Sequence, residues 1–137
     1  MKNLKEFILE SNNDKLINNF YNSHKNIFDD KPEFNGSGKC VLSINDNNVI
    51  NELKKQWNKN SDLVKGLLNN TIKFEEISSD LSKEGLMIYD NGKPSGEIYI
   101  SGIDREQSLD FIINVISANK EENVIKLGIN ILNQLIK

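Results

Sequence analysis

The sequence is poor in the residues from which catalytic and metal sites are most often built. Among its 137 residues there is one cysteine, Cys40, one histidine, His24, and one arginine, Arg105. A single cysteine excludes an intramolecular disulfide, which fits a reducing compartment. A single histidine excludes a multi-histidine metal site. We therefore expect no metal and no other cofactor, and the sequence indicates no catalytic residue.

The charge balance and the lack of long apolar runs restrict the partners. The formal net charge is −3, and one arginine is too few for the contacts that usually read guanine or clamp phosphate. Sequence-specific nucleic-acid binding is therefore not expected. No apolar stretch reaches the roughly 18 residues of a membrane span, and the run Phe7-Ile8-Leu9 is too short for a secretion signal. We expect a soluble protein that contacts no membrane and acts in the cytoplasm.

What the chain does contain is typical of one globular domain. Apolar residues make up 37% and charged residues 27% of the sequence, so a core can form without disulfides. We expect a single domain over residues 1–137. Ala118 is the only alanine, whereas asparagine, isoleucine and lysine abound. These favoured residues have AT-rich codons, which indicates a low-GC bacterium or a phage as the source.

Apolar spacing and cap-forming residues predict the secondary structure. Residues 45–48, which include Asp46, can cap a helix over 49–57, and Ser61 can cap a shorter one over 63–68. Strands are expected at 39–44, 71–77, 86–89 and 96–100, and helices at 2–10, 16–21, 49–57, 63–68, 109–116 and 121–136. Residues 24–39 show no period and are expected to form a loop. The order indicates an α+β fold, with a small, mainly antiparallel sheet of about four strands flanked by about six helices.

The clearest local signal is a hairpin over residues 86–100. Two β-rich runs flank Asn91-Gly92, a pair that favours the positive φ angles of a type I′ turn. Pro94 is expected to lengthen the loop beyond two residues. The alternation of a strand places Ile98 toward the core and Tyr99 outward.

The last two predicted helices carry broad apolar faces. Asp104 and Gln107 form a plausible capping box for a helix over 109–116. In the helix over 121–136 the apolar stripe is wide enough to predict burial in the core, and it also leaves room for a homodimer.

Several residues of types that can react or bind ligands fit structural roles instead. Cys40 lies in a predicted strand, where a buried inert thiol is expected. The segment 36–39 has the glycines and lysine of a phosphate loop but lacks its earlier glycine and its following helix. The acidic residues of 104–106 fit a helix start. We expect His24 to be an exposed loop residue and Trp57 to lie in the core.

The hairpin also carries the best candidate interaction surface. Tyr89, Lys93, Glu97 and Tyr99 are expected close together, and aromatic side chains beside charges are typical of contact hot spots. The two tyrosines fit a structural cross-strand pair as well. Both interpretations remain open at this point.

The first eleven residues resemble a known targeting signal. Met1, Lys2, Glu6, Phe7, Ile8 and Glu10 stand where the capsid-targeting segments of internal head proteins in T-even-like phages carry the same residues. The resemblance implies that residues 1–10 are removed by a prohead protease at the bond between Glu10 and Ser11. Leu4, Phe7 and Ile8 would equally form the apolar face of an ordinary first helix.

Three hypotheses of function follow. The resemblance implies a phage-encoded accessory protein, virion cargo or an inhibitor of host defence, which binds a protein partner without catalysis inside the host cell or the virion. The alternative is a bacterial immunity or adaptor protein that binds one cognate partner. A small enzyme is the third, and it would require Glu97, Asp104 and Glu106 to converge at one pocket.

Overall fold

The structure, a computed structural model, describes residues 15–35, 38–78 and 83–136. Within them one antiparallel sheet of six strands has the order β1-β2-β6-β5-β4-β3. The strands are β1 (Glu33–Asn35), β2 (Lys39–Ile44), β3 (Ile72–Glu76), β4 (Glu84–Asp90), β5 (Lys93–Ser101) and β6 (Leu109–Val115). Helices cover residues 15–23, α2 (Asn47–Gln56), α3 (Asp62–Leu67) and α4 (Glu121–Leu135), and short 3-10 turns lie at Lys25–Ile27 and Ala118–Lys120. The predicted α+β class is confirmed, whereas the predicted helix over 2–10 and the bond between Glu10 and Ser11 lie outside the described residues.

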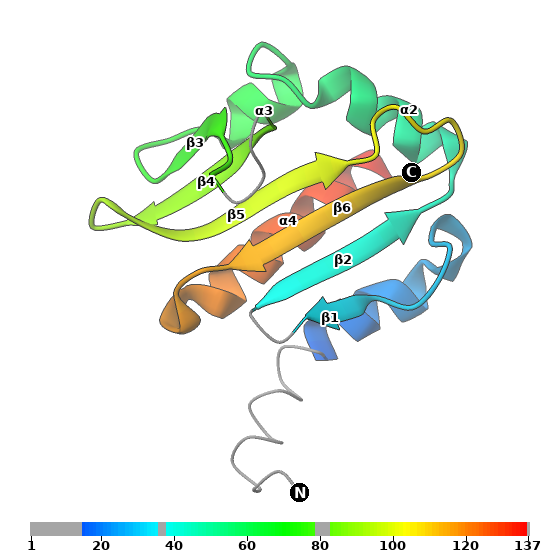
Figure 1. Ribbon diagram of the computed structural model, residues 1–137, viewed down its shortest axis with the longest axis horizontal. Helices are drawn as coiled ribbons and strands as arrows, with labels where there is room; N and C mark the ends of the chain where they lie inside the picture. The colour runs from blue at the N-terminus through cyan, green and yellow to red at the C-terminus, as the bar shows by residue number, and fades with distance from the viewer. Residues whose placement is uncertain (1–14, 36–37, 79–82, 137) are drawn as a thin grey trace, which may run out of the picture.

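The described part of the fold has two layers. Figure 1 views the sheet from the face without helices, and α4 passes behind β5 and β6. The main core lies between the sheet and the helices, and residues from every helix contribute to it. Along β2, Cys40, Leu42 and Ile44 are buried while the alternating residues are partly exposed. The predicted core face of this strand, with its buried cysteine, is therefore confirmed.

Helices α2 and α3 begin at the caps that the sequence predicts. The Asp46 carboxylate accepts a hydrogen bond from the Val49 backbone N–H at 3.1 Å, and the Ser61 hydroxyl accepts one from Val64 N–H at 3.1 Å. Each satisfies a donor that the first helical turn leaves unpaired. Trp57 follows α2, is buried, and donates its indole N–H to the Glu84 carbonyl at 3.1 Å. Its predicted place in the core is confirmed.

The hairpin of β4 and β5 turns at the predicted pair. Asn91 and Gly92 have φ of 52° and 78°, as a type I′ turn requires at both central positions. Asp90 pairs directly with Lys93, so the loop has only two residues. The expectation that Pro94 lengthens it was wrong, because this proline lies inside β5, opposite Tyr89, at the irregular end of the ladder.

Replacing Gly92 by valine is expected to destabilise the protein by roughly 1–2 kcal/mol. A Cβ atom at this position meets no other atom within 4 Å, so the cost arises from the backbone angle alone. A β-branched residue resists positive φ. The midpoint of urea unfolding measures the effect, and Lys93→Val, at an exposed neighbour in β5, is the control. Equal midpoints for the two variants would contradict the proposed turn.

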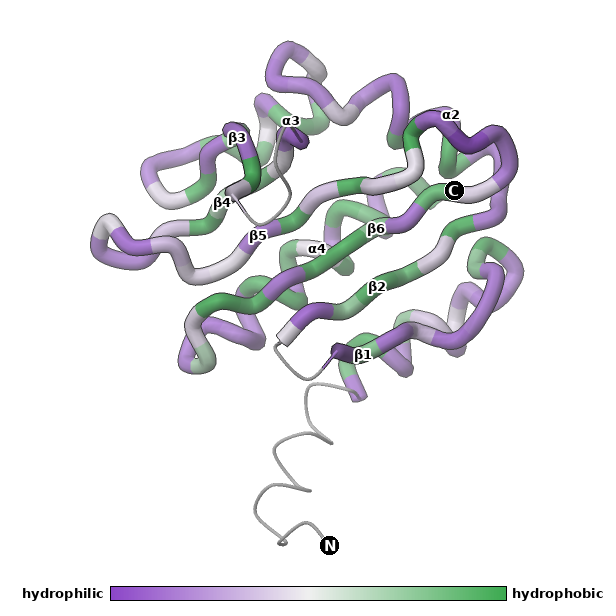
Figure 2. The backbone as a smooth tube through the Cα atoms, viewed as in Figure 1, coloured by the Kyte–Doolittle hydropathy of each residue, from purple (hydrophilic) through white to green (hydrophobic). Residues whose placement is uncertain are grey.

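The predicted helix over 109–116 is instead β6, a central strand between β2 and β5. Figure 2 shows a continuous hydrophobic stretch in the middle of this strand. Phe111 and Ile113 face the helices, while Ile112 belongs to a small cluster on the other face. A strand buried on both faces loses the alternation that distinguishes it from a helix. Asp104 and Gln107 consequently cap no helix.

The counts of elements also differ from the prediction. The described residues contain six strands and four helices, where about four and about six were expected. Besides β6, the added strand is β1, which lies within the predicted loop 24–39 and pairs with β2. A strand of three exposed residues is too short to show a period.

Helix α4 is part of the core, as predicted. Its residues Val124, Ile125, Ile131 and Leu132 are buried against the sheet. The helix lies close to β6 at Gly128, where the Cβ atom of any larger residue would sit 2.5 Å from the Ile113 Cδ1 atom. The broad apolar face of α4 is therefore covered by the protein's own sheet.

Candidate functional site

Tyr99 lies on the predicted face of the sheet but is not exposed there. Only 1% of its surface is accessible, because it packs with Ile77, Met87 and Ile112 in a second, smaller core on the face without helices. The Lys39 ammonium lies 5.9 Å from the centre of its ring. The expectation that Tyr99 faces solvent was wrong, since side chains from three other segments of the chain cover it.

Glu97 is also buried, with 1% of its surface accessible. It stands directly opposite Asn114 in the ladder between β5 and β6, and the Asn114 amide donates to its Oε1 atom at 2.7 Å. Lys93 is exposed beside the turn. Tyr89 is half-buried, and its hydroxyl donates to the Glu75 carboxylate. The structure therefore does not gather the four predicted interaction residues into one exposed surface, and their contact with a partner stays a prediction.

The acids proposed for an enzyme do not form an evident site. Glu97 lies four residues before the end of β5, roughly 13 Å along the strand. Asp104 and Glu106 are exposed in the connection that follows.

His24 is half-buried rather than exposed, with its Nδ1 atom 3.0 Å from the Phe20 carbonyl oxygen. Across the described ranges, no three His, Cys, Asp or Glu side chains are grouped to hold a metal ion, and no helix is long and apolar enough to cross a membrane.

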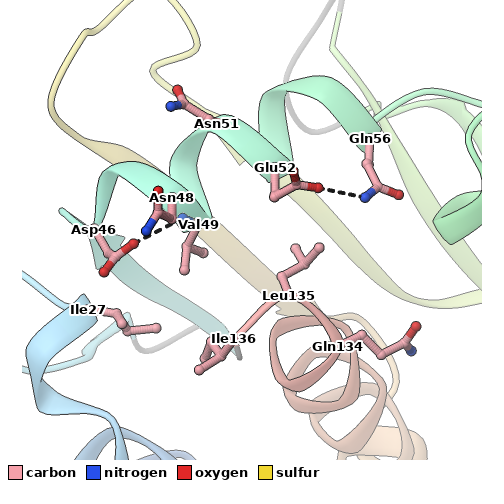
Figure 3. A pocket seen from close by; sticks show the side chains of 10 residues that line it. All are labelled: Ile27, Asp46, Asn48, Val49, Asn51, Glu52, Gln56, Gln134, Leu135 and Ile136. Atoms are coloured by element: carbon pink, nitrogen blue, oxygen red, sulfur yellow. Dashed lines mark hydrogen bonds between the residues drawn. The ribbon is translucent and has the colours of Figure 1, made fainter.

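A groove of about 580 Å³ lies between α2 and the end of α4 and is called here the α2–α4 groove (Figure 3). Its volume falls within the range of small-molecule and peptide-side-chain pockets. It is lined by Ile27, Asp46, Asn48, Val49, Asn51, Glu52, Gln56, Gln134, Leu135 and Ile136.

Helical spacing determines which side chains of α2 form one wall of the groove. Val49, Glu52 and Gln56 follow one another at three and four positions along α2, so they share one side of the helix. The opposite wall comes from Leu135, the last residue of α4, and from Ile136, which caps it. The main core between the helices and the sheet holds the two walls in place.

The groove combines an apolar centre with a polar margin. In Figure 3 the side chains of Ile27, Val49, Leu135 and Ile136 point toward its middle, while Asn51 points away. Such an apolar centre within a polar rim is the usual anatomy of a protein–protein contact.

The charges that line the α2–α4 groove are both negative. Asp46 accepts its capping bond from Val49, and Glu52 accepts a hydrogen bond from the Gln56 amide at 2.8 Å. No lysine or arginine is among the lining residues. Within the part of the chain that the structure describes, neither carboxylate forms a salt bridge.

A second groove, of about 550 Å³, lies between the hairpin and the start of α4. It includes Tyr89 and carries two lysines with acidic partners. Lys120 lies 3.8 Å from Asp90, and Lys126 lies 2.9 Å from Glu122. Its charges are thus largely matched within the protein, in contrast to those of the α2–α4 groove.

Comparison of the chain with protein-family models, with curated protein sequences and with solved structures finds no match. The candidate site therefore stands on its geometry. The sequence predicted Asp46 as part of a cap but did not reveal the groove. The spacing of Val49, Glu52 and Gln56 was a usable signal for one wall, whereas nothing in the sequence joins that wall to Leu135.

Proposed function

We propose that this chain is a phage-encoded accessory protein, carried in the virion or directed against a host defence, that binds another protein without catalysis. The observation that carries the binding role is the α2–α4 groove, with its apolar centre and two carboxylates that lack an ion-pair partner within the described residues. The resemblance of residues 1–11 to capsid-targeting segments supports the phage origin.

Partner capture tests the binding role. The tagged full-length protein is incubated with lysate of the source cells, and retained proteins are identified by mass spectrometry. Leu135→Arg should reduce retention of the partner at least about tenfold, because the long charged side chain fills the centre of the groove. Asn133→Arg makes the same change at an exposed position of α4 outside the groove and should leave retention unchanged.

Both variants must keep the melting temperature of the wild type within a few degrees for this comparison. If no protein is retained, or if Leu135→Arg retains its partner as well as Asn133→Arg does, the groove is not the binding site.

The phage assignment has a separate test. Co-expression with a T-even-type prohead protease should shorten the protein by residues 1–10, which intact mass spectrometry detects directly. Glu10→Gln should prevent this cut. An intact bond between Glu10 and Ser11, together with a toxin gene beside the coding gene, would favour the bacterial immunity or adaptor protein instead.

A further inference from the structure

We propose that the α2–α4 groove receives a short segment of the partner protein that carries a lysine or arginine between apolar side chains. This inference deepens the proposed function and rests on it, because it names the chemistry of the partner at the same groove.

The carboxylates on the α2 side of the groove favour a cationic ligand. Asp46 uses its Oδ1 atom for the Val49 N–H, and Glu52 uses its Oε2 atom for the Gln56 amide. In the described part of the chain, Asp46 Oδ2 and Glu52 Oε1 have no hydrogen-bond donor. Charge-assisted hydrogen bonds from lysine or arginine are the strongest that such oxygens accept. A cationic side chain is therefore the complement that this wall lacks.

The end of α4 adds to the negative potential. A helix carries a partial negative charge at its C-terminus, and basic side chains in the last turn often offset it. The last turn of α4 contains no basic residue. The positive end of α2 offsets part of the Asp46 charge, so Glu52 and the end of α4 attract a cation most strongly.

The apolar centre and the size of the groove define the rest of the ligand. Leu135 and Ile136 are half-buried, and Ile27 and Val49, which also line the groove, are buried. A volume of about 580 Å³ holds a few side chains and not a whole domain. A peptide segment with alternating apolar and basic residues satisfies both the centre and the wall.

The second groove differs from the α2–α4 groove in the pairing of its charges. Its lysines already have Asp90 and Glu122 as partners, so a charged ligand would have to displace an existing ion pair. The α2–α4 groove requires no such exchange. Of the two grooves, the α2–α4 groove therefore gains the more favourable binding free energy from a charged partner.

A titration with defined peptides tests the inference on the full-length protein. The probes are acetyl-Leu-Lys-Leu-Lys-Leu-amide and the same peptide with glutamine in place of lysine, followed by ¹H–¹⁵N NMR. We expect saturable shifts of backbone amides in α2 and at the end of α4, with the lysine peptide binding about fivefold more tightly.

The double variant Asp46→Asn/Glu52→Gln should abolish this preference. Asparagine caps a helix as well as aspartate does, and glutamine keeps the length of Glu52, so the fold is retained while both charges are lost. The double variant Asp90→Asn/Glu122→Gln makes the same chemical changes at the other end of α4 and should keep the fivefold preference.

Two results would overturn the inference: no saturable shift at the groove with the lysine peptide, or an unchanged lysine preference in Asp46→Asn/Glu52→Gln. If either occurs while Leu135→Arg still loses the captured partner, the groove binds a segment of different chemistry. The proposed function then stands and only this inference falls.

Discussion

Leu132→Asp is expected to lower the free energy of unfolding by at least ~4 kcal/mol, a large part of the total stability of a domain of this size. Leu132 is completely buried in α4 against the sheet. The substitution removes apolar contacts and buries a carboxylate to which the core offers no cation. Chemical denaturation followed by circular dichroism measures the loss.

Asn133→Asp is the matched control, because it introduces the same charge at the exposed neighbouring position. Its effect should stay within about 0.5 kcal/mol. A Leu132→Asp variant with the wild-type midpoint but a changed mass in solution would show that this face of α4 is an interface between molecules and not the core.

The second large effect is expected at Phe111, in the central strand β6. Phe111 is completely buried, and its ring lies 6.2 Å from the ring of Trp57, centre to centre. Phe111→Ala should cost about 3–5 kcal/mol, because a cavity remains that the surrounding strands and helices cannot fill. The expected fall in melting temperature is on the order of 10–15 °C.

Ile116→Ala is the control that separates a strand from a helix at this position. In a helix over 109–116, Ile116 would share the core face with Ile112 and Ile113 and would be as costly to truncate as they are. In the structure it lies beyond the end of β6 with 49% of its surface exposed. We expect Ile116→Ala to change the melting temperature by less than a third of the Phe111→Ala effect, and equal effects would contradict the assignment of β6.

Features that depend on neighbouring residues could be predicted from the sequence. Asp46 and Ser61 cap helices because their side chains reach a backbone N–H three residues later. Asn91 and Gly92 turn the chain because they accept positive φ. The α+β class and the buried face of β2 follow from periodicity in the same way.

The identity of β6 depended on its position in the sheet. Its apolar residues are compatible with a helix or with a strand buried on both faces, and the pairing with β2 and β5 decides between them. Tyr99 shows the same limit at one side chain. Alternation predicts its face, but the packing of Ile77 and Met87 determines that it is buried.

The candidate site is the feature most dependent on tertiary structure. Helical spacing alone puts Val49, Glu52 and Gln56 on one side of α2, but the opposite wall at Leu135 comes from the far end of the chain. Local hydrogen bonds and dihedral preferences act over a few residues, so they determine caps, turns and helix faces. Burial and groove formation depend on which distant segments pack together. Here the packing of Ile77 and Met87 buried Tyr99 on one face of the sheet, and the placement of α2 and α4 on the other face formed the groove.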